Sequence, residues 1–312
     1  MTDMTTPKLV SLPDRGLFEL GGEERIAFLN GLVSNDMAKL SPTTSLYGTF
    51  LTPQGKFLYE FFALTDGASV ILDTERERID EFRKKLRLYK LRSKVTVSES
   101  DPAAHVFALV GDSAPAALGF DADAAPGATR HLGTLAAIGD TFAVLDPRHA
   151  GLGARIVVRA ANEQSGTADI AAALADHLAV AVGSRGDYDR RRIALAVPDA
   201  SRDMIVEKSA LLESNIDRLN GISWDKGCYL GQELTARTHY RGLVKRRLVP
   251  LRFADGTPPE IGAEITKDGS VVGDIRSAAG DLVLASVKLA ALDGDGPPLR
   301  VGDTVLEPLP TP

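Results

Sequence analysis

Cysteine is nearly absent from this chain, and so are several signatures of cofactor sites. Cys228 is the one cysteine in 312 residues, so no internal disulfide can form, and a cytoplasmic location is the expectation. Neither GxxxxGK[ST] nor a strand-anchored GxGxxG occurs, which leaves nucleotide hydrolysis and dinucleotide binding unsupported. No apolar run approaches the ~18 residues that span a bilayer, and residues 1–16 lack the basic and apolar regions of a signal peptide. We therefore expect neither a membrane segment nor a leader.

The balance of charge limits the class of partner. The formal net charge is −6 and the sequence pI is about 5.5, so we expect no general affinity for nucleic acid. One tract is basic although the chain as a whole is acidic. It contains Arg237, Arg241 and residues 245–247. We predict that these side chains bridge two domains. The alternative is a local anion site for a polyglutamyl tail or an RNA backbone.

Hydrophobic patterning in residues 1–241 indicates mixed strands and helices. A hydrophobic content of 44% over this length is enough for two domains. Two strands are predicted within 45–64, joined by a turn around Pro53, Gln54 and Gly55, and a charged helix is predicted within 74–91. The helix has an inner stripe formed by Ile79, Phe82 and Leu86. Further strands are predicted within 68–74, 94–100, 105–111, 141–146 and 154–160, and further helices within 21–36 and 169–183.

The order of these elements favours one fold class. Hairpins rather than regular βαβ units connect the predicted strands, which is typical of an α+β architecture. The stretch 111–139 is rich in Ala, Gly, Pro and Asp, so we expect a long loop that contributes little to the hydrophobic core. The one clear element predicted in it is 132–139.

The pattern of the sequence changes near Lys245, where a series of short predicted strands begins. Short strands are predicted within 246–253, 263–266, 270–275, 282–289 and 303–309, separated by Gly- and Asp-rich turns. The KDG at 267–269 is a hairpin signal. Such a series predicts a small antiparallel barrel or sandwich. We divide the chain into an α+β region at 1–241 and a C-terminal β domain at 242–312.

The lone cysteine lies in the segment KGCYLGQE, residues 226–233. Gly227 and Gly231 would let the backbone turn sharply and bring Cys228 close to a ligand or partner. Lys226 would favour the thiolate, and Gln232 and Glu233, which follow Tyr229, could orient the loop by hydrogen bonds. The alternative is that these polar residues only cap the loop and hold the domain junction.

The residues also leave the role of the thiol open. A structural zinc site or an iron–sulfur cluster needs about four ligands, and the five histidines are scattered without ligand-like spacing. We expect no permanently bound metal, and any cluster contact of Cys228 would have to be transient or shared with a partner chain. A buried inert cysteine and a catalytic pair with His239, eleven residues downstream, are the other interpretations.

The string GISWDKGCYLGQELTARTHYRG closely resembles the K-G-C-[YF]-x-G-Q-E signature of the YgfZ-like, or CAF17-like, family of folate-binding iron–sulfur cluster assembly factors. The segments FLNGLVSND, LTPQGKFLYEFF, LYKLRSKV and RRIALAVP are similar to this family as well. The resemblance implies the fold of the glycine cleavage T-protein, a tetrahydrofolate-dependent aminomethyltransferase. That fold has a folate-binding α+β region of interleaved subdomains, followed by a small C-terminal antiparallel β-barrel.

Departures from the T-protein argue against aminomethyl transfer. Its adjacent acidic pair falls at Tyr59 and Glu60, which leaves one carboxylate. The glutamate expected to hold the pterin ring falls at Ala194, so the N–H donors of the ring would lose a partner. We expect an accessory factor rather than an enzyme. A one-carbon transferase and a tRNA-modification factor are the alternatives.

The resemblance also implies partners and a ligand. It predicts assembly, insertion or repair of [4Fe-4S] clusters in client proteins, which include radical enzymes that use S-adenosylmethionine, with A-type cluster carriers as partners. Tetrahydrofolate is expected in the α+β region near residues 30–36. The residues predicted to bind it are Asn30, Asn35, Asp36, Glu60 and Arg237.

Overall fold

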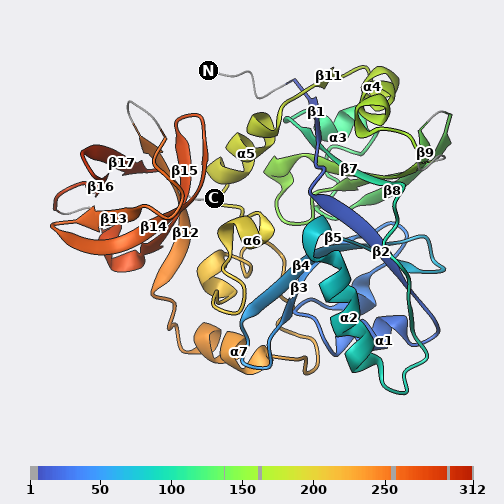
Figure 1. Ribbon diagram of the computed structural model, residues 1–312, viewed down its shortest axis with the longest axis horizontal. Coiled ribbons are helices and arrows are strands. Elements are labelled where there is room, and N and C mark those ends of the chain that lie inside the picture. Colours follow the sequence, from blue (N-terminus) through green and yellow to red (C-terminus); the bar gives the residue numbers. More distant parts are fainter. Residues whose placement is uncertain (1–5, 137, 161–163, 254–257, 294–295, 311–312) are drawn as a thin grey trace.

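The computed structural model describes residues 6–136, 138–160, 164–253, 258–293 and 296–310, which form two sheets, a barrel and the helices around them (Figure 1). None of the helices in these residues is both long and apolar enough to cross a membrane. The described residues also form five 3₁₀ helices, which are η1 Met37–Lys39, η2 Arg76–Arg78, η3 Ala150–Leu152, η4 Leu212–Ser214 and η5 Leu289–Ala291.

The first sheet has five antiparallel strands in the order β3-β4-β5-β2-β6. Their bounds are β2 Arg15–Gly21, β3 Leu46–Leu51, β4 Phe57–Thr65, β5 Val70–Glu75 and β6 Thr96–Val97. Every residue of β4 is buried, because helix α2 (Ile79–Lys90) covers one face of the sheet and the second sheet covers the other. Phe82 of α2 stacks on Tyr59, with ring centroids 4.5 Å apart. The predicted hairpin and the predicted inner stripe of this helix are confirmed.

The helix predicted within 21–36 is shorter than its apolar pattern suggests. Helix α1 covers Arg25–Asn30, and Val33 lies beyond its end as a bridge partner of Phe50 in β3. Leu29 and Val33 are both fully buried although only Leu29 is helical. The apolar spacing therefore marked the buried face correctly but not the end of the helix.

The second sheet has six strands in the order β11-β1-β7-β10-β9-β8. Their bounds are β1 Lys8–Ser11, β7 Ala104–Val110, β8 Thr129–Leu135, β9 Gly139–Leu145, β10 Ala154–Ala160 and β11 Ala181–Val182. Helix α4 (Thr167–Leu178) packs on this sheet. The subdomains interleave, because the consecutive strands β1 and β2 belong to different sheets.

The prediction that 111–139 is a long loop with little contribution to the core was wrong in part. The short helix α3 (Ala114–Ala117) buries Ala114, and Leu118 joins the same core cluster. Strand β8 pairs with β9 and extends the sheet at its edge. Most of its side chains are exposed or half-buried, so the segment lacks the apolar pattern of an inner strand.

The C-terminal strands close into a barrel in the order β12-β15-β14-β13-β16-β17, which Figure 1 shows beside the two sheets. Their bounds are β12 Arg246–Phe253, β13 Glu264–Lys267, β14 Ser270–Ala279, β15 Leu282–Lys288, β16 Leu299–Val301 and β17 Thr304–Pro308. The KDG hairpin joins β13 to β14, with positive φ angles of 50° at Asp268 and 70° at Gly269. These are the angles of a type I′ turn. Strand β16 is short and was not predicted.

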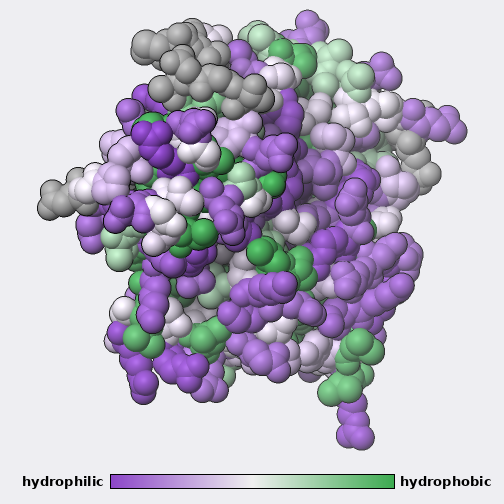
Figure 2. All heavy atoms as spheres, turned by 60° about the vertical axis from the view of Figure 1, so that its left-hand side comes forward, coloured by the Kyte–Doolittle hydropathy of each residue, from purple (hydrophilic) through white to green (hydrophobic). Residues whose placement is uncertain are grey.

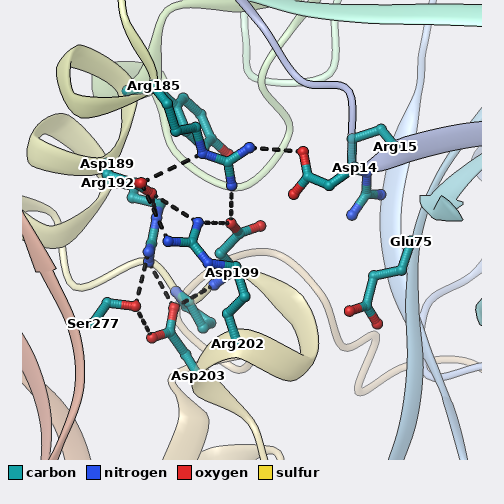
Figure 3. A network of polar contacts seen from close by, with 12 residues as sticks. Asp14, Arg15, Glu75, Arg185, Asp189, Arg192, Asp199, Arg202, Asp203 and Ser277 are labelled. Carbon is teal, nitrogen blue, oxygen red and sulfur yellow. Dashed lines mark hydrogen bonds and ion pairs between the residues drawn. The ribbon is translucent and has the colours of Figure 1, made fainter. Parts of the chain in front are cut away.

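The connecting segment between the sheets and the barrel contains the last three α-helices, α5 Arg185–Ala194, α6 Ala200–Asp203 and α7 Gln232–Tyr240. A buried ionic network fixes α5 and α6 to the barrel (Figure 3). Arg192 forms ion pairs of 2.6 Å with both Asp189 and Asp203, and its Nη2 donates to Ser277 Oγ of β14 at 2.9 Å. Because these groups are buried, the contacts hold the barrel in one place against the rest of the molecule.

Candidate functional site

The lone cysteine is exposed at the edge of a cavity. Cys228 lies in the loop that precedes α7, and its side chain is not part of the core. The cavity has a volume of about 650 Å³. Its walls come from the β3–β4 turn, the Cys228 loop and α7, through Pro53, Cys228, Tyr229, Gly231, Gln232, Glu233, Ala236, Arg237, Tyr240 and Arg241. The interpretation of Cys228 as a buried inert residue was wrong.

Two glycines bring the Cys228 loop against the β3–β4 turn. Gly231 has φ +78°, and a Cβ there would lie 2.4 Å from the carbonyl oxygen of Thr52. Gly55 of the turn also has φ +78°, and a Cβ there would lie 2.6 Å from the carbonyl oxygen of Gly231. Only residues without a side chain permit this mutual approach. Gly227, in contrast, has no positive φ, and a Cβ there would meet open space, so the backbone reason applies to Gly231 alone.

Lys226 ties the Cys228 loop to the loop after α1. Its Nζ donates to the carbonyl oxygens of Asn30 at 2.7 Å, Val33 at 2.8 Å and Asn35 at 2.7 Å. Burial lowers the pKa of Lys226 to about 8, and Asp36 opposes this shift. An ammonium group has three N–H donors, and here main-chain carbonyls take all three. The residue therefore positions the loop, which is a different role from the thiolate stabilisation suggested by the sequence.

The remaining residues of the segment shape the start of α7. Gln232 Oε1 accepts a hydrogen bond of 2.9 Å from the backbone N–H of Tyr229, which closes the turn around Leu230. The Tyr229 side chain packs against the apolar cluster beneath the loop, and burial raises the pKa of its hydroxyl to about 12. Glu233 is almost fully exposed and lies 4.0 Å from Arg237. The segment thus combines fixed main chain with exposed side chains.

His239 is engaged away from the thiol. Its ring stacks on Trp224 with centroids 3.8 Å apart. Among the described residues no hydrogen bond joins His239 to Cys228, so a catalytic cysteine–histidine pair has no geometric support. The described part of the chain also contains no group of three or more His, Cys, Asp and Glu side chains that could hold a metal ion.

Three residues predicted to bind folate, Asn30, Asn35 and Asp36, form hydrogen bonds within the protein. Asn30 Oδ1 accepts from the N–H of Met37 at 2.9 Å, and Asp36 Oδ1 accepts from the N–H of Ala38 at 3.1 Å. Asn35 Nδ2 donates to the carbonyl oxygen of Tyr47 at 2.7 Å. These contacts give the side chains a structural role, and their contact with folate stays a prediction. Arg237 lies at the Cys228 cavity.

Glu60, the fourth predicted folate contact, lies in a buried cluster of charged residues. Its Oε1 pairs with Arg15, while Oε2 and the hydroxyl oxygen of Tyr47 are buried without a hydrogen-bond partner among the described residues. Burial and the nearby Glu60 carboxylate raise the pKa of Tyr47. The Tyr47 hydroxyl, itself a hydrogen-bond donor, is therefore buried close to this carboxylate. A ligand with N–H donors would satisfy such a carboxylate oxygen.

Sequence reasoning missed the arginines around this position. The guanidinium groups of Arg15, Arg148 and Arg155 lie over the ring of Phe62 at 5.3, 4.8 and 3.8 Å from its centroid. Asp73 pairs with both Arg15 and Arg155, which connects the two sheets. The sequence signal that could have indicated these buried arginines is a charged residue within an otherwise apolar strand, as in ARIVVRA at 154–160.

Comparison with known proteins gives the family. A family model described as the CAF17 C-terminal beta-barrel domain matches residues 245–311. The mitochondrial iron-sulfur cluster assembly factor IBA57 of Mus musculus is 31% identical over 302 residues, which cover 91% of this chain and 78% of that protein. IBA57 of Homo sapiens is 33% identical over 291 residues, which cover 88% of this chain and 75% of that protein.

A solved structure of low sequence identity shows the fold. Aminomethyltransferase T of the glycine cleavage system from Bartonella henselae superposes with a TM-score of 0.74 at 14% identity, over 98% of this chain and 85% of that one. The predicted T-protein-like fold with a C-terminal barrel and the predicted resemblance to CAF17-like proteins are both confirmed. This chain belongs to the family of the iron-sulfur cluster assembly factor IBA57.

Proposed function

We propose that this protein is an accessory factor for the assembly, insertion or repair of [4Fe-4S] clusters in client proteins, including radical enzymes that use S-adenosylmethionine. The names of its relatives support cluster assembly in general. The observation that carries the proposal for this chain is the exposed Cys228 beside a cavity, on a loop whose main chain is fixed by Lys226 and Gly231.

The thiol can act as one ligand of a cluster that another protein brings. A cluster usually needs about four ligands, and this chain has one cysteine to offer. A partner that already holds the cluster through its own cysteines would supply the others. We therefore propose A-type cluster carriers as the partners that meet the Cys228 loop, with the cluster as cargo.

The cluster content of a client enzyme tests the proposal. Cells that lack the protein should yield a client with less [4Fe-4S] cluster, and the parent chain should restore it while Cys228→Ser does not. Because Cys228 is exposed, the variant should unfold at the same denaturant concentration as the parent. A client that is fully loaded in cells without the protein would overturn the proposed function.

We also propose a reduced folate as a ligand of the α+β region. The T-protein-like fold supports it, and so does Glu60 Oε2, which accepts no hydrogen bond from the residues that the structure describes, because pterin N–H groups need a carboxylate or another acceptor. Binding should be weaker than in a T-protein, since Ala194 replaces the expected glutamate. Calorimetry with millimolar tetrahydrofolate tests this, and the absence of both heat and a thermal shift would exclude folate.

The cytoplasmic location stays a prediction. The names of the relatives describe those proteins as mitochondrial.

A further inference from the structure

The C-terminal end of α2 presents two exposed leucines among unpaired basic side chains. Leu88 is 73% exposed and Leu91 is 87% exposed. Lys84 lies one helical turn before Leu88, and Lys90 and Arg92 are the sequence neighbours of Leu91. In the described part of the chain none of these three basic residues forms an ion pair or a side-chain hydrogen bond. We name these five residues the α2 patch. On the face drawn in Figure 2, hydrophilic side chains dominate and hydrophobic ones form small separate groups.

The packing of α2 does not require these leucines. The inner face of the helix is formed by Ile79, Phe82, Arg83 and Leu86, which are buried against the sheet. Leu91 ends the helix with φ 45° and ψ −109°, a conformation that leucine adopts at a cost of roughly 1–3 kcal/mol. Because Leu91 is so exposed, its side chain buries little apolar surface in the isolated chain. Its side chain is available to another surface.

The charge of this end of α2 is opposite to that of the whole molecule. Residues 84–94, KKLRLYKLRSK, contain six basic and no acidic residues, whereas the chain carries a net charge of −6. Two of the six are neutralised, Arg87 by Glu99 and Lys94 by Glu23. The others leave a local positive field around the two leucines, which favours an acidic surface.

The α2 patch and the Cys228 loop border the same apolar cluster. Tyr89 of α2 packs on Phe50 of β3, with ring centroids 5.7 Å apart. Leu230, two residues after Cys228, packs against that same cluster, and Lys226 binds the loop that follows α1. Figure 1 shows the end of α2, α1 and α7 at the lower end of the molecule.

We infer that the α2 patch docks the cluster-carrying protein whose cluster reaches Cys228. The inference rests on the proposed function, because that function supplies the partner. A cluster held by thiolates carries net negative charge, so acidic residues around an apolar spot on its carrier would complement the patch. A protein fits better than RNA, since leucine side chains gain nothing from phosphate groups. A membrane fits less well, because the apolar face of α2 is already buried.

The test separates docking from ligation. Leu91→Gly removes the side chain and relieves the backbone strain, and Arg92→Glu reverses one charge. Ile261→Ser and Arg300→Glu are the matched controls, because both residues are exposed on the barrel. The probe is an A-type carrier loaded with its cluster. Calorimetry measures its affinity for each variant, and the visible spectrum of the complex reports ligation by Cys228.

We expect Leu91→Gly to weaken the complex by about tenfold, as loss of one buried leucine contact predicts. Arg92→Glu should also weaken it, because it places a negative charge against an acidic surface, while both controls should bind like the parent. The thermal midpoint of Leu91→Gly should equal or exceed that of the parent. At saturating carrier the spectral change should remain, because Cys228 is intact.

Two other outcomes overturn the inference in different ways. If both α2 variants bind like the parent and the spectrum still depends on Cys228, the docking surface is wrong and the proposed function stands. If the parent forms no complex with the carrier, both are wrong. Binding to total tRNA or to phosphatidylserine vesicles that needs Arg92, with unchanged carrier affinity of Arg92→Glu, would assign the patch to another partner and also overturn the inference.

Discussion

At the scale of single residues, residues 226–233 combine an exposed thiol with a main chain that Lys226 and Gly231 fix in place. The lone cysteine among glycines predicted an exposed thiol loop, and the exposed Cys228 agrees. Lys226 was predicted to favour the thiolate form of Cys228. Its Nζ instead donates hydrogen bonds to three main-chain carbonyls about 190 residues away in sequence. Contacts of that kind depend on tertiary structure, so no local pattern contains them. Gly231 was recognised as a turn residue, whereas its contact with Gly55 was not.

The two glycines of the segment give a matched pair of variants. Gly231→Ala should lower the free energy of unfolding by about 2–4 kcal/mol, because the new Cβ would meet the Thr52 carbonyl oxygen at 2.4 Å in a left-handed conformation. Gly227→Ala should change it by less than about 0.5 kcal/mol, since that Cβ meets open space. Urea denaturation of both variants checks this. Equal stabilities would show that the loop does not depend on the close approach.

At the scale of elements, prediction succeeded where the hydrophobic pattern is set by burial. Strands β3, β4 and β5, helix α2 and five of the six barrel strands follow their apolar patterns, because each buries a face in a core. Prediction failed for strand β8 because it is an edge strand with few buried residues. It failed for β16 because three residues are too few to show a hydrophobic pattern. Polar signals at helix ends were also missed, including the Ser184–Asp187 capping box of α5.

That capping box gives a prediction about pH. Hydrogen bonds from Lys8 and from the backbone and hydroxyl of Ser184 lower the pKa of Asp187 from 3.8 to about 2. The folded-state pKa lies below the unfolded one, so the stabilisation is complete above about pH 4 and is lost as the pH falls toward 2. Asp187→Asn should therefore cost about 1 kcal/mol at pH 7, and the cost should shrink at pH 3.

Denaturant melts at pH 7, 5 and 3 measure this difference. Asp121→Asn is the control, because Asp121 is exposed outside any helix. A cost for Asp187→Asn that stays constant down to pH 3 would contradict the role of the charged carboxylate.

At the scale of the whole molecule, buried ion pairs join parts that are far apart in sequence. Arg155 and Arg15 share Asp73 between the two sheets, and Arg192 links α5 to the barrel. The partners in these pairs are separated by up to 85 residues, so the sequence could suggest the fold by resemblance but not these links. These links hold the two sheets and the barrel together as one frame.

The last prediction is that this frame holds no stable cluster by itself. The chain offers one thiol and five histidines, and the described residues contain no group of three or more that could hold a metal ion. A symmetric dimer would bring only two thiols, whereas a cluster usually needs about four ligands. The protein purified without oxygen should be colourless, with negligible iron and sulfide. About four irons per monomer, found by iron analysis, would contradict this, because this chain would then hold a cluster with no more than one thiolate of its own.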